Sequence, residues 1–160
     1  MQINIVAVGT RMPSWIGAGF AEYQLRLPAN MRPKLIEVPL EKRLKTTVIN
    51  KAVEKESEAL FKKTHSDDCV IVLDVLGSKI STDEVAEFLK HSQLRGKSIC
   101  FLIGGPDGIC PRYIRRAQFC WSLSEMTLPH SLVRVILLEQ LYRAWSINAH
   151  QPYHRGRREE

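Results

Sequence analysis

The residues with the clearest chemical potential form a glycine-rich turn, 104–108, with the sequence Gly-Gly-Pro-Asp-Gly. The turn follows an apolar run, 99–103, that is typical of a buried strand. Two adjacent glycines let a backbone approach a ligand closely, and the neighbouring proline favours a fixed turn whose N–H groups point at that ligand. The glycine spacing matches neither the dinucleotide-binding nor the Walker phosphate-binding pattern. A plain strand-to-helix turn is therefore the alternative to a ligand site.

Arginine is the second chemical feature of the sequence. The formal net charge is +6, and residues 111–160 hold eight arginines, four glutamates and no lysine. Arginine binds phosphate through a planar pair of donors and also stacks on bases. We therefore expect a polyanionic partner, and RNA rather than a membrane because no basic amphipathic helix is evident. An ordinary solvated basic surface is the alternative.

The cysteines do not indicate a metal or redox centre. They are spread singly along the chain, and no pair has the two-residue spacing of a zinc or redox site; they are Cys69, Cys100, Cys110 and Cys120. Cys69 and Cys100 fall inside predicted strands, where a reduced thiol acts as a small apolar side chain. We expect no metal site.

Composition is that of a soluble globular protein. Of the 160 residues, 44% are hydrophobic and 25% are charged, and no apolar run is long enough to cross a bilayer. The start of the chain, 1–9, has no positively charged region of a signal peptide, so we expect a cytoplasmic protein without membrane association. We expect a single domain, 1–155, followed by a frayed C-terminal extension, 156–160.

Strand and helix patterns alternate along the chain. Apolar runs predict strands at 3–8, 34–38, 69–75, 99–103 and 119–123. Helical spacing predicts helices at 15–25, 47–63, 111–118 and over about sixteen residues from Leu132, with another after a capping box at 81–84. This order predicts an α/β fold with a mainly parallel sheet flanked by helices, whose ligand lies beyond the carboxyl ends of the strands. Leu73 and the glycine turn mark those ends.

Two segments leave alternatives open. The basic stretch 41–46 is expected to be mobile, and its lysines and arginine could contact phosphate or be solvated. The last helix is apolar nearly all round apart from Arg134, which suits either a subunit interface or a central core helix. Within that helix Glu139 and Arg143 have the spacing of an i,i+4 pair, so Arg143 could be structural rather than catalytic.

Several segments, taken in order, carry a resemblance to one family. They are Val6-Ala-Val-Gly-Thr10, the turn 102–108, the segment 121–127, Leu128-Pro-His130, Leu141-Tyr-Arg-Ala-Trp-Ser146 and Pro152-Tyr-His-Arg155. Together they resemble the ribosomal large subunit methyltransferase H family of the SPOUT class, enzymes that methylate N3 of a pseudouridine in 23S ribosomal RNA. The match covers nearly the whole chain.

The resemblance implies a SPOUT-type fold with a C-terminal trefoil knot, a homodimer, and S-adenosylmethionine as cofactor. By position, the cofactor site comprises Leu73, Gly104, Gly105, Leu123, Ser124, Glu125, Met126, Thr127 and Leu128. The catalytic or substrate-contacting residues carried over are His130, Tyr153 and Arg155. Arg143 and His154 are second candidates for the same roles. Arg143 or Arg155 would stabilise the developing ring anion, while His130 or Tyr153 orients the base or relays the proton.

A chain of this length has little surface for RNA, so we expect a partner subunit's tail and basic residues to hold the target. We also expect recognition of an assembled ribosomal surface rather than a short naked RNA. The alternatives are a non-catalytic, ribosome-associated RNA-binding protein that uses no cofactor, and a tRNA-directed SPOUT methyltransferase.

Overall fold

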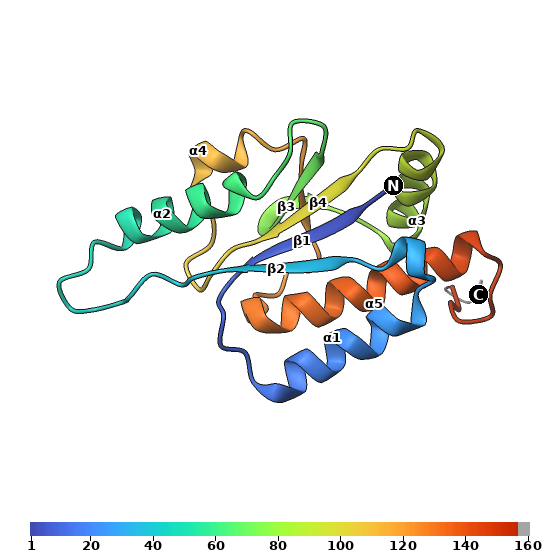
Figure 1. The fold of residues 1–160 in the computed structure, drawn as a ribbon, viewed down its shortest axis with the longest axis horizontal. Coiled ribbons are helices and arrows are strands. Elements are labelled where there is room, and N and C mark those ends of the chain that lie inside the picture. Colours follow the sequence, from blue (N-terminus) through green and yellow to red (C-terminus); the bar gives the residue numbers. More distant parts are fainter. Residues whose placement is uncertain (157–160) are drawn as a thin grey trace.

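Strands and helices alternate along the chain in the computed structural model, which describes residues 1–156 (Figure 1). In order the elements are β1 (Ile3–Val8), α1 (Ser14–Arg26), a 3-10 turn η1 (Ala29–Met31), β2 (Lys34–Val38), α2 (Ile49–Lys62), β3 (Cys69–Lys79), α3 (Thr82–Leu94), β4 (Ile99–Ile103), α4 (Pro111–Ile114), β5 (Phe119–Ser122) and α5 (His130–Asn148). Apart from Gly156, the predicted extension 156–160 lies outside the described residues.

The five strands form one sheet in the order β2-β1-β4-β3-β5, and every neighbouring pair is parallel. The α/β prediction is therefore confirmed. All strands end at one edge, where Ile103 pairs with Ala7 on one side and Leu73 on the other. In sheets of this kind the carboxyl edge is where ligands bind. The trefoil knot that the resemblance implies stays a prediction, as does the single domain over 1–155.

Helices cover both faces of the sheet, because the strand residues are apolar on both sides. Alternate residues of β1 point to opposite faces, so Ile5 joins one buried cluster and Val6 the other. The first cluster packs under α1, α3 and α5, and the second under α2 and α4 (Figure 1). Among the described residues, none of the helices is long and apolar enough to span a membrane.

Two elements differ from the sequence prediction at the β5 edge. β3 continues to Lys79 instead of ending at 75, with a register shift between Leu73 and Ser78 in its pairing with β5. Gly77 permits this close approach, since a Cβ there would lie 2.7 Å from the Cys120 carbonyl oxygen. α4 ends at Ile114 instead of 118, because the backbone and side chain of Gln118 both bond to Val70 of β3.

α5 is the central helix of its layer. It is nineteen residues long, starts at His130 rather than Leu132, and packs against both α1 and α3. Its one basic residue in the apolar stretch, Arg134, is 1% exposed. The guanidinium donates to Glu37 Oε2 at 2.6 Å and to the carbonyl oxygens of Val8 and Gly9 at 3.3 and 2.8 Å. Arg134 therefore ties α5 to the carboxyl ends of β1 and β2, and these contacts support the core-helix alternative.

Cys69 and Cys100 are buried in β3 and β4, as predicted. Burial raises the pKa of both thiols, that of Cys100 to about 12. Neither thiol therefore ionises near neutral pH, and both act as packing groups.

The packing of α1 on α5 can be tested with two glycines of α1. A Cβ at Gly17 meets nothing within 4 Å, whereas a Cβ at Gly19 would lie 3.3 Å from Val135 Cγ1. Gly17→Ala should raise the free energy of unfolding by about 0.5–1 kcal/mol, the difference in helix propensity. Gly19→Ala should raise the free energy of unfolding by less, or lower it, because its Cβ crowds Val135. Both changes are measured by urea unfolding. Equal gains at the two positions would contradict this close packing.

Candidate active site

A cleft of about 350 Å³ opens at the carboxyl edge of the sheet. Four segments line it: the end of β3, the glycine turn after β4, the loop after β5, and the first turn of α5. Of the predicted cofactor residues, eight line this cleft: Leu73, Gly104, Gly105, Leu123, Ser124, Met126, Thr127 and Leu128. Glu125 does not line it, because its carboxylate pairs with Lys79 on β3. Segments distant in sequence thus meet where the strand pattern predicts.

The glycines of the turn are required by the turn itself. Gly104 and Gly105 are buried. A Cβ at Gly104 would lie 2.8 Å from Ile109 Cγ1 and 2.9 Å from the Gly108 backbone, and Gly108 has a φ of 79°. The Gly108 N–H donates to the Gly105 carbonyl oxygen at 3.0 Å, which closes the turn. The bare backbone is therefore explained by close packing within the turn, whether or not a ligand lies against it.

The opposite wall is a loop held by its own serines. Ser122 Oγ donates to the Ser124 carbonyl oxygen at 2.8 Å, and Ser124 Oγ accepts from the Met126 N–H at 2.9 Å. These bonds fix the loop between β5 and α5, while the Met126 side chain is 74% exposed. The sequence analysis did not include Asp74 in the site, although it lines the cleft from the β3 side.

His130 is the one predicted catalytic residue that lines the cleft. It starts α5, one turn before the buried Arg134. Burial lowers the pKa of His130, and the positive charge of Arg134 lowers it further. The imidazole is therefore neutral near pH 7 and able to accept a proton.

Two other predicted catalytic residues, Arg143 and Tyr153, contact Glu139 in the middle of α5. Arg143 Nε donates to Glu139 Oε1 at 2.8 Å, so the predicted i,i+4 pair is present. The Tyr153 hydroxyl donates to the same oxygen at 3.1 Å, and the Arg143 guanidinium lies over the Tyr153 ring. Burial, assisted by the bond to Glu139, raises the pKa of Tyr153 to about 12. His154 contacts Arg143, whereas Arg155 is exposed.

One chain does not bring these two groups together. Thirteen residues of a single helix separate His130 from Arg143, a distance of about 20 Å at the α-helical rise. Figure 1 shows α5 running from the carboxyl edge of the sheet to the side where the chain ends. Within one protomer, Tyr153 and Arg143 therefore lie away from the cleft that His130 lines.

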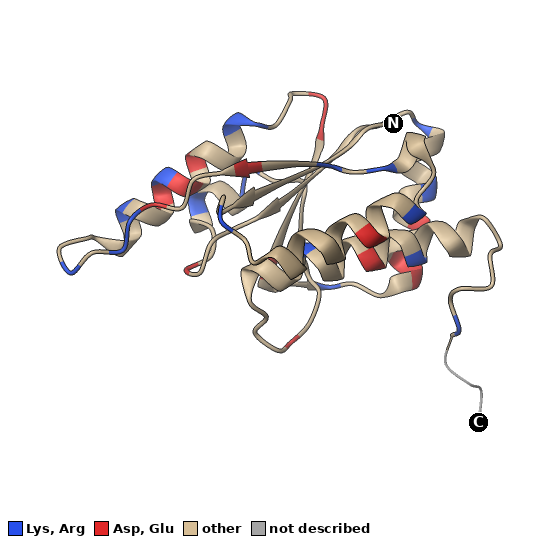
Figure 2. Ribbon diagram, turned by 60° about the horizontal axis from the view of Figure 1, so that its bottom comes forward, with Lys and Arg blue, Asp and Glu red and all other residues tan. Residues whose placement is uncertain are grey.

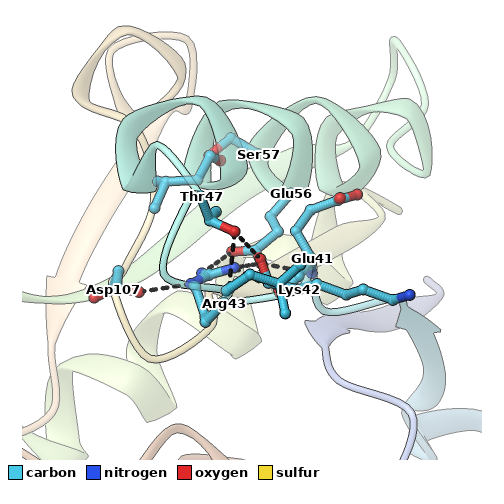
Figure 3. Close-up of polar contacts among 9 residues, drawn as sticks. Glu41, Lys42, Arg43, Thr47, Glu56, Ser57 and Asp107 are labelled. Carbon is cyan, nitrogen blue, oxygen red and sulfur yellow. Dashed lines mark hydrogen bonds and ion pairs between the residues drawn. The ribbon is translucent and has the colours of Figure 1, made fainter.

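The sequence analysis missed an ion-pair cluster beside the glycine turn (Figure 3). Arg43 donates to both carboxylate oxygens of Glu56 at 2.9 and 3.0 Å, and to Asp107 Oδ2 at 3.0 Å. Glu56 is 1% exposed, and its hydrogen bonds raise the pKa of Arg43. The prediction that the basic residues of 41–46 are solvated or free for phosphate is therefore wrong for Arg43.

A signal for this cluster was present in α2. Glu56 and Ser57 lie among the apolar positions that α2 buries, Val53 and Leu60, and a buried carboxylate needs a cationic partner. Ser57 Oγ accepts from the Cys110 N–H at 2.9 Å, so α2 also holds the chain just after the glycine turn. Among residues 1–156, no three His, Cys, Asp or Glu side chains gather as metal ligands would.

Comparison with known proteins places this architecture in a family. Residues 1–154 match the family described as predicted SPOUT methyltransferases. The chain belongs to this family. Among the solved structures, the SPOUT methyltransferase chain is similar to a probable methylase family protein from Haemophilus influenzae Rd KW20, with a TM-score of 0.53. That match covers 96% of this chain and 70% of the other at 12% identity, and so bears on the fold alone.

Two curated relatives indicate which branch of the family the chain is similar to, and both are named ribosomal RNA large subunit methyltransferase H. The protein from Marinomonas sp. (strain MWYL1) is 44% identical and that from Saccharophagus degradans is 46% identical, each over 155 residues. Each alignment covers 97% of this SPOUT methyltransferase chain and the whole of the relative. The resemblance inferred from the sequence segments is therefore confirmed.

The Arg43–Glu56 pair is expected to dominate the stability of this part of the enzyme. Arg43→Met leaves a buried carboxylate without its cation, which should cost about 3–5 kcal/mol of unfolding free energy in urea at pH 7. Arg26→Met is the matched control, because the Arg26–Glu22 pair is 41% and 60% exposed and its loss should cost under about 1 kcal/mol. Glu56→Gln added to Arg43→Met should recover much of the loss. Similar costs for the two arginines would contradict the role of the buried pair.

Proposed function

We propose that this SPOUT methyltransferase transfers a methyl group from S-adenosylmethionine to N3 of a pseudouridine in 23S ribosomal RNA, acting as a homodimer on the assembled ribosome in the cytoplasm. The observation that carries the proposal is the full-length identity of 44–46% to two proteins named ribosomal RNA large subunit methyltransferase H. The finer details, the cofactor and the target atom, follow from the family resemblance.

The cleft has apolar walls with a few polar groups, which suits the faces and the polar edge of the adenine of a bent cofactor. Its volume is within the range of small-molecule sites, and Leu73, Leu123 and Leu128 supply apolar walls. The turn at Gly104 and the loop around Ser124 would offer backbone groups to the donor. When bound, the cofactor supplies an electrophilic methyl group on a positively charged sulfonium. The carboxylate of Asp74, which lines the cleft, favours such a charge.

The protein's own residues have two tasks, orientation and management of one proton. Holding the acceptor nitrogen in line with the methyl group supplies much of the acceleration. The acceptor is a weakly acidic ring N–H, so a neutral base and a nearby cation both lower the barrier. His130 is neutral and lines the cleft, which fits the first role. Arg143 or Arg155 fits the second.

The second role requires another copy of the chain. Arg143 lies about 20 Å along α5 from His130 by the helical rise, and Tyr153 bonds to Glu139 and does not line the cleft. In a two-fold symmetric dimer, the C-terminal segment of each subunit can reach the cleft of the other, and two identical sites result. This arrangement gives the tail 152–155 a function that it does not have within one protomer.

The substrate is tested by transfer of labelled methyl groups from S-adenosylmethionine to ribosomes, large subunits and bulk tRNA, all prepared from cells lacking this protein. Label in 23S RNA at a pseudouridine is the expected result. Label in tRNA alone would keep the fold and cofactor but contradict the substrate. No label, together with no S-adenosylmethionine binding, would contradict methyl transfer and favour a non-catalytic RNA-binding protein.

Sharing of the site between subunits is tested by mixing two variants. His130→Ala impairs the cleft and Arg155→Ala impairs the tail, and each homodimer should have low turnover. When the two are refolded together in equal amounts, half of the dimers are mixed, and each mixed dimer has one intact site if the tail acts on the partner's cleft. Activity should then return to about a quarter of wild type. No recovery in dimers verified as mixed would place both residues in one subunit's site.

A further inference from the structure

Four lysines near the start of α2 have unmatched positive charge. Lys42 and Lys45 lie in the loop before α2, and Lys51 and Lys55 lie in its first turns. All four are exposed, and none forms an ion pair within residues 1–156. We refer to Lys42, Lys45, Lys51 and Lys55 as the lysine surface. Figure 2 shows basic positions along this loop and helix, with acidic ones interspersed.

The acidic residues of α2 do not neutralise the lysine surface, because each has another partner. Glu54 pairs with Arg112 of α4, Glu56 with Arg43, and Glu58 with Lys62. Two of these three partners are arginines from other elements. The pairing therefore leaves the lysine ammonium groups available to an external anion.

The lysine surface borders a groove as well as solvent. Between the loop and the start of α2 lies an open groove of about 630 Å³. Lys42, Lys51 and Lys55 line it, together with the hydroxyl-bearing Thr46 and Thr47 and a single acidic residue, Glu41, so cations outnumber carboxylates there. Ammonium and hydroxyl groups along an open groove are the groups that contact the sugar–phosphate backbone of a nucleic acid.

The Arg43 cluster holds this groove beside the active-site cleft. Arg43 lies between groove residues of the loop and bonds to Asp107, which lines the cleft. In Figure 3 the side chain of Arg43 points toward Glu56, whereas the side chain of Lys42 extends away from both. The arginine thus anchors the loop, and the neighbouring lysine remains free to reach a ligand that extends beyond the cleft.

We infer that the lysine surface binds backbone phosphates of the ribosomal RNA that carries the target nucleotide. The inference rests on the proposed function, since it identifies the polyanion as that enzyme's substrate. Flexible ammonium groups bind phosphates without reading sequence, so this surface positions the RNA and leaves the choice of nucleotide to the cleft. Exposed Leu44 and Val48 on the same loop would suit a ribosomal protein, and the experiment separates that partner from RNA.

The test compares binding of large ribosomal subunits by two quadruple variants over a series of KCl concentrations. The test variant is Lys42→Gln, Lys45→Gln, Lys51→Gln and Lys55→Gln. The matched control is Lys34→Gln, Lys63→Gln, Lys90→Gln and Lys97→Gln, which removes the same charge from exposed positions. Lys34 starts β2, and Lys63 and Lys97 lie shortly before β3 and β4, at the edge of the sheet opposite the cleft.

The test variant should bind subunits at least about tenfold more weakly at low salt, and its slope of log affinity against log salt should be shallower by about three to four, one unit or slightly less for each lost phosphate contact. The control should keep the wild-type slope. Both should bind S-adenosylmethionine as the wild type does, because none of the eight lysines lines the cleft.

Equal losses of subunit affinity in the test and control variants would overturn the inference. A test variant that loses affinity but keeps the wild-type salt slope would also overturn it, because that result points to apolar contact with a ribosomal protein. If the wild type methylates subunits but the test variant behaves like the control, only this inference fails. A wild-type protein that neither binds nor methylates subunits would overturn the proposed function, and this inference with it.

Discussion

Two charges are buried at the carboxyl edge of the sheet, one from each helical layer, and each must be paired. Glu56 comes from α2 on one face and is held by Arg43, while Arg134 comes from α5 on the other face and bonds to Glu37 and the end of β1. A Cβ at Gly105 would contact Glu56, and one at Gly9 would contact Arg134. The two strand ends between them are therefore held from both sides, and the cleft opens on this fixed edge.

The sequence predicts most of this arrangement because apolar runs and glycine turns are local signals. The run 99–103 and the turn after it appear in the structure at the predicted positions, and eight of the nine predicted cofactor residues line one cleft. What the sequence does not reveal depends on distant partners. Arg43 reaches 64 residues along the chain to Asp107, and Glu125 turns to Lys79 rather than to the cleft.

The length of α5 explains why the two halves of the predicted catalytic set separate. Family resemblance places His130 and Tyr153 in one site without saying which subunit supplies each. A straight helix of nineteen residues keeps its two ends apart, so the geometry of one protomer divides the set in two. The Glu139 carboxylate bonds to both Arg143 and Tyr153 and so organises them into one unit, which in the proposed dimer acts on the partner's cleft.

The order of strands also determines when the active-site edge can form during synthesis. The central strand is β4, which lies between β1 and β3, so β1 gains that neighbour only after residues 99–103 have been made. Arg134 then closes the carboxyl end of β1 across 126 residues of chain. Contacts of such separation make folding slow and late, and a partly synthesised chain exposes its apolar strands until then. Because its walls include the loop after β5 and the first turn of α5, the cleft cannot be complete until α5 has been made, and a chain truncated before α5 would lack part of it.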